Sequence, residues 1–327
     1  MAVSRRTLLM VVAGGALAGC GARTVATGGG SAAPPASASV PDAAAEPGTA
    51  AVAASGIPEE AAAVPTATAG PTPATPEPAA PATPAPGTPA PSKEPTRAEV
   101  VERYGDAAPT DWGLEVARVI TELPDGERAT ALTFDACGGP GGNGYDADLI
   151  DFLRAHAVPA TLFLNARWID ANPDEFEQLA ADPLFEIGNH GTVHRPLSVT
   201  GRSAYGIAGT RDVGEVYDEV AGNARKLAGL LGHPPRFFRS GTAHYDDIAT
   251  RIVADLGERV AGFTVNGDGG ATLSASEVRQ EVASAGPGAI VIGHLNHPGG
   301  GTAPGVAAAV PGMLAAGRRF VRLSDVM

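Results

Sequence analysis

Short apolar runs alternate with longer segments of helical periodicity through the C-terminal two thirds of this chain. We expect buried strands at 129–134, 160–164, 185–188, 236–239, 260–265, 289–293 and 319–323. We expect helices between them at 146–156, 173–181, 213–231, 246–256, 275–285 and 305–316. Strands that alternate with helices predict an α/β fold with a parallel sheet. So many repeated units in one domain favour a closed barrel over an open, doubly wound sheet.

Polar residues follow the predicted strands at the positions where each strand ends. They are Asp135, His190, Arg239, Asp268 and His294. The carboxyl ends of barrel strands form one mouth, and barrels of this kind carry their chemistry there. We therefore expect these five side chains to share a site.

Two imidazoles four residues apart, His190 and His194, are spaced to bind one divalent metal. Histidines at this spacing also arise by chance on a solvated helix face, so the pair alone does not decide the matter. A second group, Thr133 to Gly139, ends another apolar run with Asp135 at its tip. Together the two segments suggest a hydrolytic site.

The N-terminal residues 1–20 have the pattern of an export signal. The segment around Arg5-Arg6 resembles a twin-arginine signal, and Leu17 to Cys20 resembles a bacterial lipobox. A lipobox implies that Cys20 is lipidated and anchors an extracytoplasmic protein to the cell membrane. The alternative is an ordinary cleaved secretory peptide in which the cysteine occurs by chance.

Residues 21–98 are rich in Ala, Pro and Thr and poor in large apolar side chains. Such a composition buries too little surface to offset chain entropy, so we expect a disordered linker that lets the domain reach into a cell wall. Residues 99–327 have the length of one domain with a full core. The formal net charge of -13 argues against nucleic acid as a partner. With Cys20 lipidated, Cys137 has no partner for an intramolecular disulfide.

At roughly 129–327 the chain resembles the polysaccharide deacetylases, the NodB-homology family also called carbohydrate esterase family 4. The matching segments are Thr133-Phe134-Asp135, the pair His190 and His194, Phe238-Arg239, Asp268, and Ile292-Gly293-His294. The resemblance implies a distorted, incomplete (β/α) barrel. It also implies metal binding by the two histidines, a catalytic base at Asp135 and a general acid at His294.

The chain departs from this family at Ala136, which replaces the aspartate that would be the third protein ligand to the metal. Asp135 could bind instead, the Cys137 thiolate could reach the ion, or the metal could keep an additional water. A thiolate ligand would favour zinc, which is the divalent metal we expect. The alternative interpretation of Cys137 is a small buried hydrophobic residue. His244 and His297 are further candidates near the predicted mouth.

Two of the predicted catalytic residues also allow a purely structural interpretation. We expect Arg239 to hold a carboxylate, that of Asp135 or Asp268, through a charge-assisted hydrogen bond, but it could equally form a salt bridge at the barrel rim. Asp268 lies among glycines and could be a turn residue.

The function we expect is metal-dependent hydrolysis of N-acetyl groups on a cell-wall or other extracellular polysaccharide, either peptidoglycan or a chitin-like polymer. The substitution at Ala136 keeps a catalytically silent glycan-binding barrel open as an alternative. A third possibility is an amidohydrolase acting on a small non-sugar amide. The sequence has no Gly-x-Ser-x-Gly motif, which argues against a serine esterase.

Overall fold

An eight-stranded parallel sheet forms the centre of the computed structural model, which describes residues 94–327. Neighbouring strands follow the order β2, β8, β6, β5, β4, β3, β10, β9. Their bounds are β2 (Val119–Ile120), β3 (Ala131–Ala136), β4 (Ala160–Leu164), β5 (Phe185–Asn189), β6 (Phe237–Phe238), β8 (Arg259–Ala261), β9 (Val265–Asn266) and β10 (Ile290–His294). Because β2 and β9 end the sheet, the barrel is incomplete, as predicted. A separate antiparallel pair joins β1 (Trp112–Gly113) to β7 (Tyr245–Asp246).

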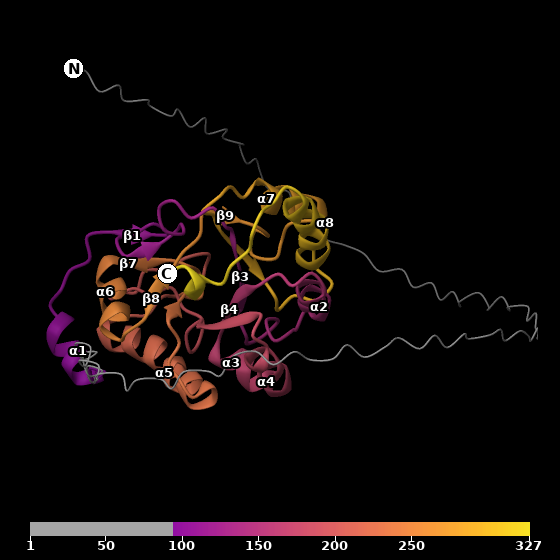
Figure 1. Cartoon of the computed structure of the whole chain (residues 1–327). Coiled ribbons are helices and arrows are strands. Elements are labelled where there is room, and N and C mark those ends of the chain that lie inside the picture. Colours follow the sequence, from indigo (N-terminus) through magenta and orange to yellow (C-terminus); the bar gives the residue numbers. More distant parts are fainter. Residues whose placement is uncertain (1–93) are drawn as a thin grey trace, which may run out of the picture. The chain divides into compact units, whose positions relative to one another are not determined.

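Helices surround this sheet (Figure 1). They are α1 (Arg97–Tyr104), α2 (Ala147–Ala155), α3 (Ala166–Ala171), α4 (Pro173–Ala181), α5 (Val213–Leu231), α6 (Asp247–Asp255), α7 (Ala275–Ser284) and α8 (Thr302–Ala315). The predicted bounds of α4 and α5 are confirmed at both ends. Local signals explain this agreement: α4 begins at a proline, and α5 runs from the capping side chain of Asp212 to Gly232 in the left-handed conformation.

Strands β3 and β4, in the interior of the sheet, are buried on both faces. Every residue of β3 and β4 is buried. Helices cover the outer face of the sheet and side chains of neighbouring strands fill its inner face, so such strands are continuous apolar runs instead of alternating ones. The polar exceptions in β3 are Thr133, whose hydroxyl donates to the carbonyl of Val291, and Asp135. Asp135 therefore needs partners inside the protein.

The predicted strand 260–265 is two short strands that belong to different parts of the sheet. β8 lies between β2 and β6, whereas β9 pairs with β10 at the other end. The carbonyls of Ala261 and Gly262, where β8 ends, accept hydrogen bonds from the Arg239 guanidinium. The chain then crosses the open side of the barrel, which a pattern of apolar residues cannot reveal.

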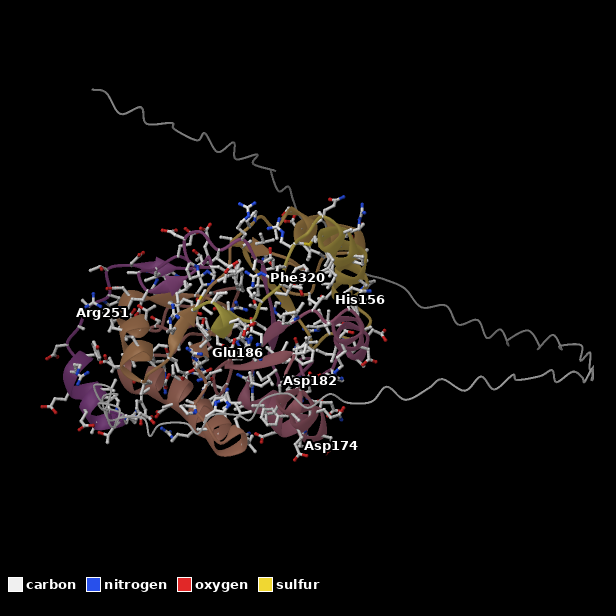
Figure 2. The ribbon with its side chains drawn as sticks, in the orientation of Figure 1. His156, Asp174, Asp182, Glu186, Arg251 and Phe320 are labelled. Carbon is white, nitrogen blue, oxygen red and sulfur yellow. The ribbon has the colours of Figure 1, made fainter. Side chains whose placement is uncertain are left out.

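The predicted last strand, 319–323, is wrong. Phe320 makes a single bridge to Thr130, and the chain then forms a 3-10 helix at Leu323–Asp325. Here side chains accept the hydrogen bonds of backbone amides: the Ser324 amide donates to the Glu186 carboxylate over 3.1 Å. Glu186 and Phe320 are labelled in Figure 2. At Leu323 and Ser324, side-chain acceptors take the place of the backbone carbonyls of a neighbouring strand.

Several predictions concern residues outside 94–327. These are the export signal 1–20, Cys20, and the linker as far as residue 93. Helix α1 begins at Arg97, two residues before the expected start of the domain, and its start is fixed by a capping box between Thr96 and Glu99. No helix between 94 and 327 is long and apolar enough to cross a membrane.

Candidate active site

The five predicted strand-end residues lie at the carboxyl edge of the sheet. Asp135 is the second-last residue of β3 and His294 is the last residue of β10, and these two residues are register partners on neighbouring strands. His190 follows β5 and Arg239 follows β6, after the register pair Asn189 and Phe238. Asp268 follows β9. The structure therefore brings all five residues to one edge of the sheet.

Three side chains at this edge form a group suited to a metal ion. One ligand atom from each of Cys137, His190 and His194 lies within 4.8 Å of the others. His194 Nε2 is buried and has no hydrogen-bond partner, and Cys137 Sγ lies 3.8 Å from His190 Nε2. An orphaned buried nitrogen is costly unless a ligand satisfies it. The donor set therefore fits a thiophilic divalent cation such as zinc.

Cys137 offers a donor atom beside the two histidines, whereas Ala136 offers none. Ala136 is fully buried and belongs to the main apolar core, so its methyl group contributes to packing. Asp135, the other candidate ligand, lies outside the three-atom group. Of the three alternatives that the sequence left open for the third metal ligand, the geometry favours the Cys137 thiolate.

A hydrogen bond at the far side of the His190 ring sets its orientation. Nδ1 lies 2.9 Å from the carbonyl oxygen of Arg239, which can only accept, so Nδ1 carries the proton and Nε2 is left free. A ligand histidine is commonly fixed in this way by its second nitrogen. Burial lowers the pKa of His190, but Asp135 and Cys137 outweigh it and the net pKa is raised.

The loop that carries His194 rests on a carboxylate that the sequence analysis missed. Glu219, on α5, is buried and accepts from the amides of Val193 and Arg195. Gly191 has φ +77°, and a Cβ there would lie 2.4 Å from Glu219 Oε1. Glu219 thus fills the space beside Gly191 and supports a loop in which His194 has φ +64°. On sequence alone, Glu219 is one more acid on a helix.

Asp135 is fixed by Arg239 in a fully buried ion pair. Arg239 Nη1 donates to Asp135 Oδ1 over 2.8 Å, and the second oxygen, Oδ2, lies 3.7 Å from His190 Nε2. Burial raises the pKa of Asp135, but Arg239, His190 and His294 outweigh burial and leave the pKa below its ordinary value. Asp135 is consequently an ionised carboxylate beside the three-atom group, and Arg239 holds this acid and not Asp268.

His294 and Asp268 form a second pair. The Asp268 carboxylate accepts from the His294 amide over 2.7 Å and lies 3.0 Å from Nδ1 of its ring. Thr302 and the amides of Gly270 and Ala271 also donate to Asp268. Burial lowers the pKa of His294, but Asp268 and Cys137 raise it well above its ordinary value. Asp268 is therefore a partner of His294, with its turn contacts serving to hold the carboxylate.

Charge on Cys137 follows from the same surroundings. Burial raises the pKa of its thiol, but the nearby imidazoles of His190, His194 and His294 bring the pKa well below its ordinary value. A thiolate is the form that binds metals. The interpretation of Cys137 as an inert buried hydrophobic residue does not account for three imidazoles around it.

A cavity of about 390 Å³ opens over these groups. Its lining includes Asp135, Cys137, His194 and His294, together with Tyr205, Phe263 and His297. Tyr205 is 76% exposed. The Tyr205 ring meets His244 edge to face at 5.1 Å, and His244 in turn lies 5.8 Å from Trp112. An aromatic rim therefore borders the cavity, and both additional histidines lie at or beside it.

Residues 122–261 match the family model for polysaccharide deacetylases. This match identifies a polysaccharide deacetylase region in the chain. A relative in the family, a chitooligosaccharide deacetylase of Bradyrhizobium sp. (strain ANU 289), is 29% identical over 180 residues, covering 54% of this chain and 74% of the relative.

Solved structures of polysaccharide deacetylase relatives share the fold. A family 4 carbohydrate esterase pseudoenzyme from Bacillus anthracis superposes with a TM-score of 0.54 at 21% identity, over 68% of this chain and 70% of that one. A peptidoglycan N-acetylglucosamine deacetylase superposes with a TM-score of 0.52 at 22% identity, over 63% and 91% of the two chains. The family thus includes deacetylases and a pseudoenzyme on one fold, so activity must be argued from the site.

Proposed function

We propose that this protein hydrolyses N-acetyl groups on an extracellular polysaccharide, with a divalent metal, and releases acetate. The observation that carries the proposal is the placement of Asp135 and His294 around the Cys137, His190 and His194 group at one cavity. The two residues have opposite charge states: Asp135 is ionised, and the raised pKa of His294 keeps its ring protonated at neutral pH. A base and an acid flanking one site suit amide hydrolysis.

Cys137, His190 and His194 would hold the metal. When bound, the metal would polarise the acetyl carbonyl and acidify a bound water. Zinc is favoured because a thiolate is one of the three ligands.

Asp135 is placed to accept the proton of the attacking water. Its Oδ1 is engaged by Arg239, so Oδ2 is the oxygen that remains for proton transfer. The water oxygen bonds to the acetyl carbon, and the bond from that carbon to the amide nitrogen then breaks. His294 donates its proton to the departing nitrogen, and Asp268 stabilises the charged ring until that step.

A sugar polymer suits the entrance of the cavity. The exposed ring of Tyr205 beside His244 offers an apolar face of the kind on which sugar rings stack. The relatives named above include deacetylases of chitooligosaccharide and of peptidoglycan N-acetylglucosamine. These two glycans are therefore the substrates to test first.

The substitution at Ala136 favours a second candidate, a silent glycan-binding barrel, because the family includes a pseudoenzyme. Acetate release from peptidoglycan, from chitin oligosaccharides and from small N-acetyl amides separates the candidates. Chelator-sensitive release from a glycan supports a deacetylase. Release from the small amides alone supports an amidohydrolase, and glycan binding without release supports the silent barrel.

We further propose that Cys20 is lipidated and anchors the domain outside the cell membrane. The support is the Leu17 to Cys20 motif at the end of an export signal. Metabolic labelling with a radioactive fatty acid should mark the wild-type protein and leave the Cys20→Ala variant unlabelled. Equal labelling of both proteins would contradict the anchor.

A further inference from the structure

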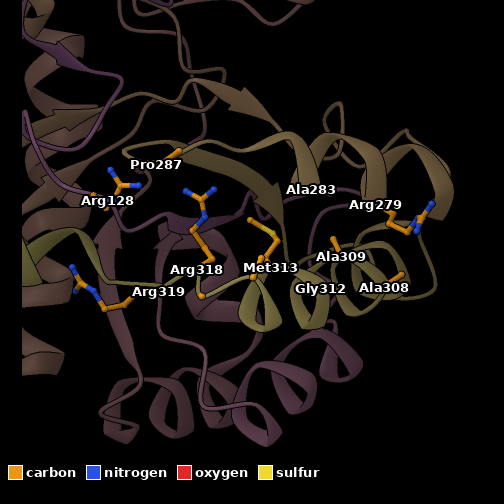
Figure 3. A pocket seen from close by; sticks show the side chains of 12 residues that line it. Arg128, Arg279, Ala283, Pro287, Ala308, Ala309, Gly312, Met313, Arg318 and Arg319 are labelled. Atoms are coloured by element: carbon orange, nitrogen blue, oxygen red, sulfur yellow. The ribbon is translucent and has the colours of Figure 1, made fainter.

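A second cavity, of about 750 Å³, lies away from the catalytic mouth and is lined by four arginines. They are Arg128, Arg279, Arg318 and Arg319 (Figure 3). They come from three segments: the approach to β3, helix α7, and the turn after α8. Figure 3 shows Arg128, Arg318 and Arg319 toward one end of the pocket and Arg279 at the other.

Three of these four cations have no side-chain partner among residues 94–327. Arg319 pairs with Glu127 over 2.7 Å. The side chains of Arg128, Arg279 and Arg318 make neither an ion pair nor a hydrogen bond to any other residue between 94 and 327. This positively charged cavity contrasts with the chain as a whole, which has a formal net charge of -13. Like charges gathered in one cavity repel one another unless an anion lies between them.

Arg318 gives the most specific indication of a missing acceptor. Its Nη1 is withdrawn from solvent and has no hydrogen-bond partner. A buried charged donor without an acceptor is costly, and a bound anion would remove that cost. Arg128 and Arg318, which lie toward the same end of the pocket, offer forked N–H donors of the kind that recognise phosphate oxygens.

The remaining lining is apolar and includes Ala309, Met313 and Pro287. A cavity of this volume accommodates a small organic ligand. Phosphate has more acceptor oxygens and more charge than a carboxylate, so it can satisfy several arginines together. We propose that this cavity binds a phosphate group carried on a small organic body.

The location makes the cavity independent of the proposed active site. Arg128 precedes β3 and Pro287 precedes β10, whereas Asp135 and His294 lie at the carboxyl ends of these strands. The two cavities therefore open at opposite ends of the strands. A ligand in the arginine-lined cavity should not compete with substrate or with metal.

Calorimetric titration of inorganic phosphate into the full chain tests the proposal. Metal is first removed by chelation so that phosphate cannot bind it, and ionic strength is held constant because salt screens exposed charges. We expect saturable binding at one site. Acetate at the same ionic strength should bind about tenfold or more weakly, since it offers fewer acceptors for the same donors. Equal affinity for acetate, or no saturable binding of phosphate, would overturn the proposal.

Arginine variants locate the site. Arg318→Gln and Arg128→Gln should each weaken phosphate binding about tenfold or more, because each removes charge-assisted hydrogen bonds. Arg251→Gln makes the same charge change on α6, on the opposite flank of the molecule from α8 in Figure 2, and should leave affinity unchanged.

Equal weakening in all three variants would show a diffuse charge effect and contradict a site. Circular dichroism checks that each variant is folded. If Arg318→Gln fails to fold, the exposed Arg128 decides the question, and an unchanged affinity in Arg128→Gln would sink the proposal.

Discussion

Arg239 and Asp135 form an ion pair in which neither side chain is more than 4% exposed. The guanidinium also donates to the carbonyls of Ala261 and Gly262 and lies 4.2 Å from the centre of the Phe163 ring. Every part of this arginine is therefore engaged. The pair fixes Asp135 from one side and leaves its other oxygen toward the metal-ligand group.

Removing the arginine should destabilise the fold. Arg239→Gln leaves a buried carboxylate without its charge partner, and we expect a loss of about 3–5 kcal/mol in the free energy of unfolding at neutral pH. The pKa of Asp135 is depressed in the folded protein, so this stabilisation is present above the unfolded pKa and is lost as pH falls through the folded pKa. Urea denaturation at neutral and acid pH should show the difference between variant and wild type shrinking as the solution is acidified. A constant difference would contradict the assignment.

Replacing the thiol should weaken metal binding while leaving the histidines in place. We expect Cys137→Ser to lower metal affinity by at least about tenfold, since changes even behind the ligands have effects of this size. Cobalt-substituted wild-type protein should show a thiolate-to-cobalt charge-transfer absorption that is absent in Cys137→Ser. If both proteins give the same spectrum, the sulfur is not a ligand.

The pair of His294 and Asp268 predicts a pH effect. His294→Ala should lower turnover by about 10² to 10⁴ fold with metal content intact. Because Asp268 raises the pKa of His294, Asp268→Asn should lower that pKa, so the alkaline fall in kcat/KM should move to lower pH. Partial activity with an unshifted profile would make Asp268 a structural residue only.

Because Gly191 lies against Glu219, adding one methyl group at position 191 should lower the stability of the protein. Gly191→Ala places a Cβ 2.4 Å from Glu219 Oε1 at φ +77°, and we expect a loss of about 1–3 kcal/mol in stability together with weaker metal binding through His194. Gly229→Ala, on α5 with open space around its Cβ, is the matched control and should be neutral or slightly stabilising. Thermal unfolding of both variants checks this, and similar effects would show that the contact is unimportant.

Much of the site could be predicted from the residues that follow the strands. The carboxyl ends of parallel strands meet at one edge, so Asp135, His190 and His294 could be placed together before any coordinates were known. The partner of Arg239 could not be chosen between Asp135 and Asp268, because that choice depends on which strands are neighbours. Local hydrophobic periodicity predicts strands and helices, but it does not predict the order of the strands in the sheet.

Features that depend on irregular backbone or on distant contacts were not predicted. Tyr205 lies in a loop between β5 and α5 with no periodic pattern, and Glu219 acquires its role only because α5 packs under the loop of His194. The final strand failed because Glu186 supplies an acceptor from another element. In each case a tertiary partner decided the local structure.

Metal analysis of the purified full chain tests the central claim most directly. We predict one tightly bound divalent metal per chain in the wild type, with substantial loss from both His190→Ala and His194→Ala, and acetate release that stops when the metal is removed. Full metal occupancy in both histidine variants would contradict the account.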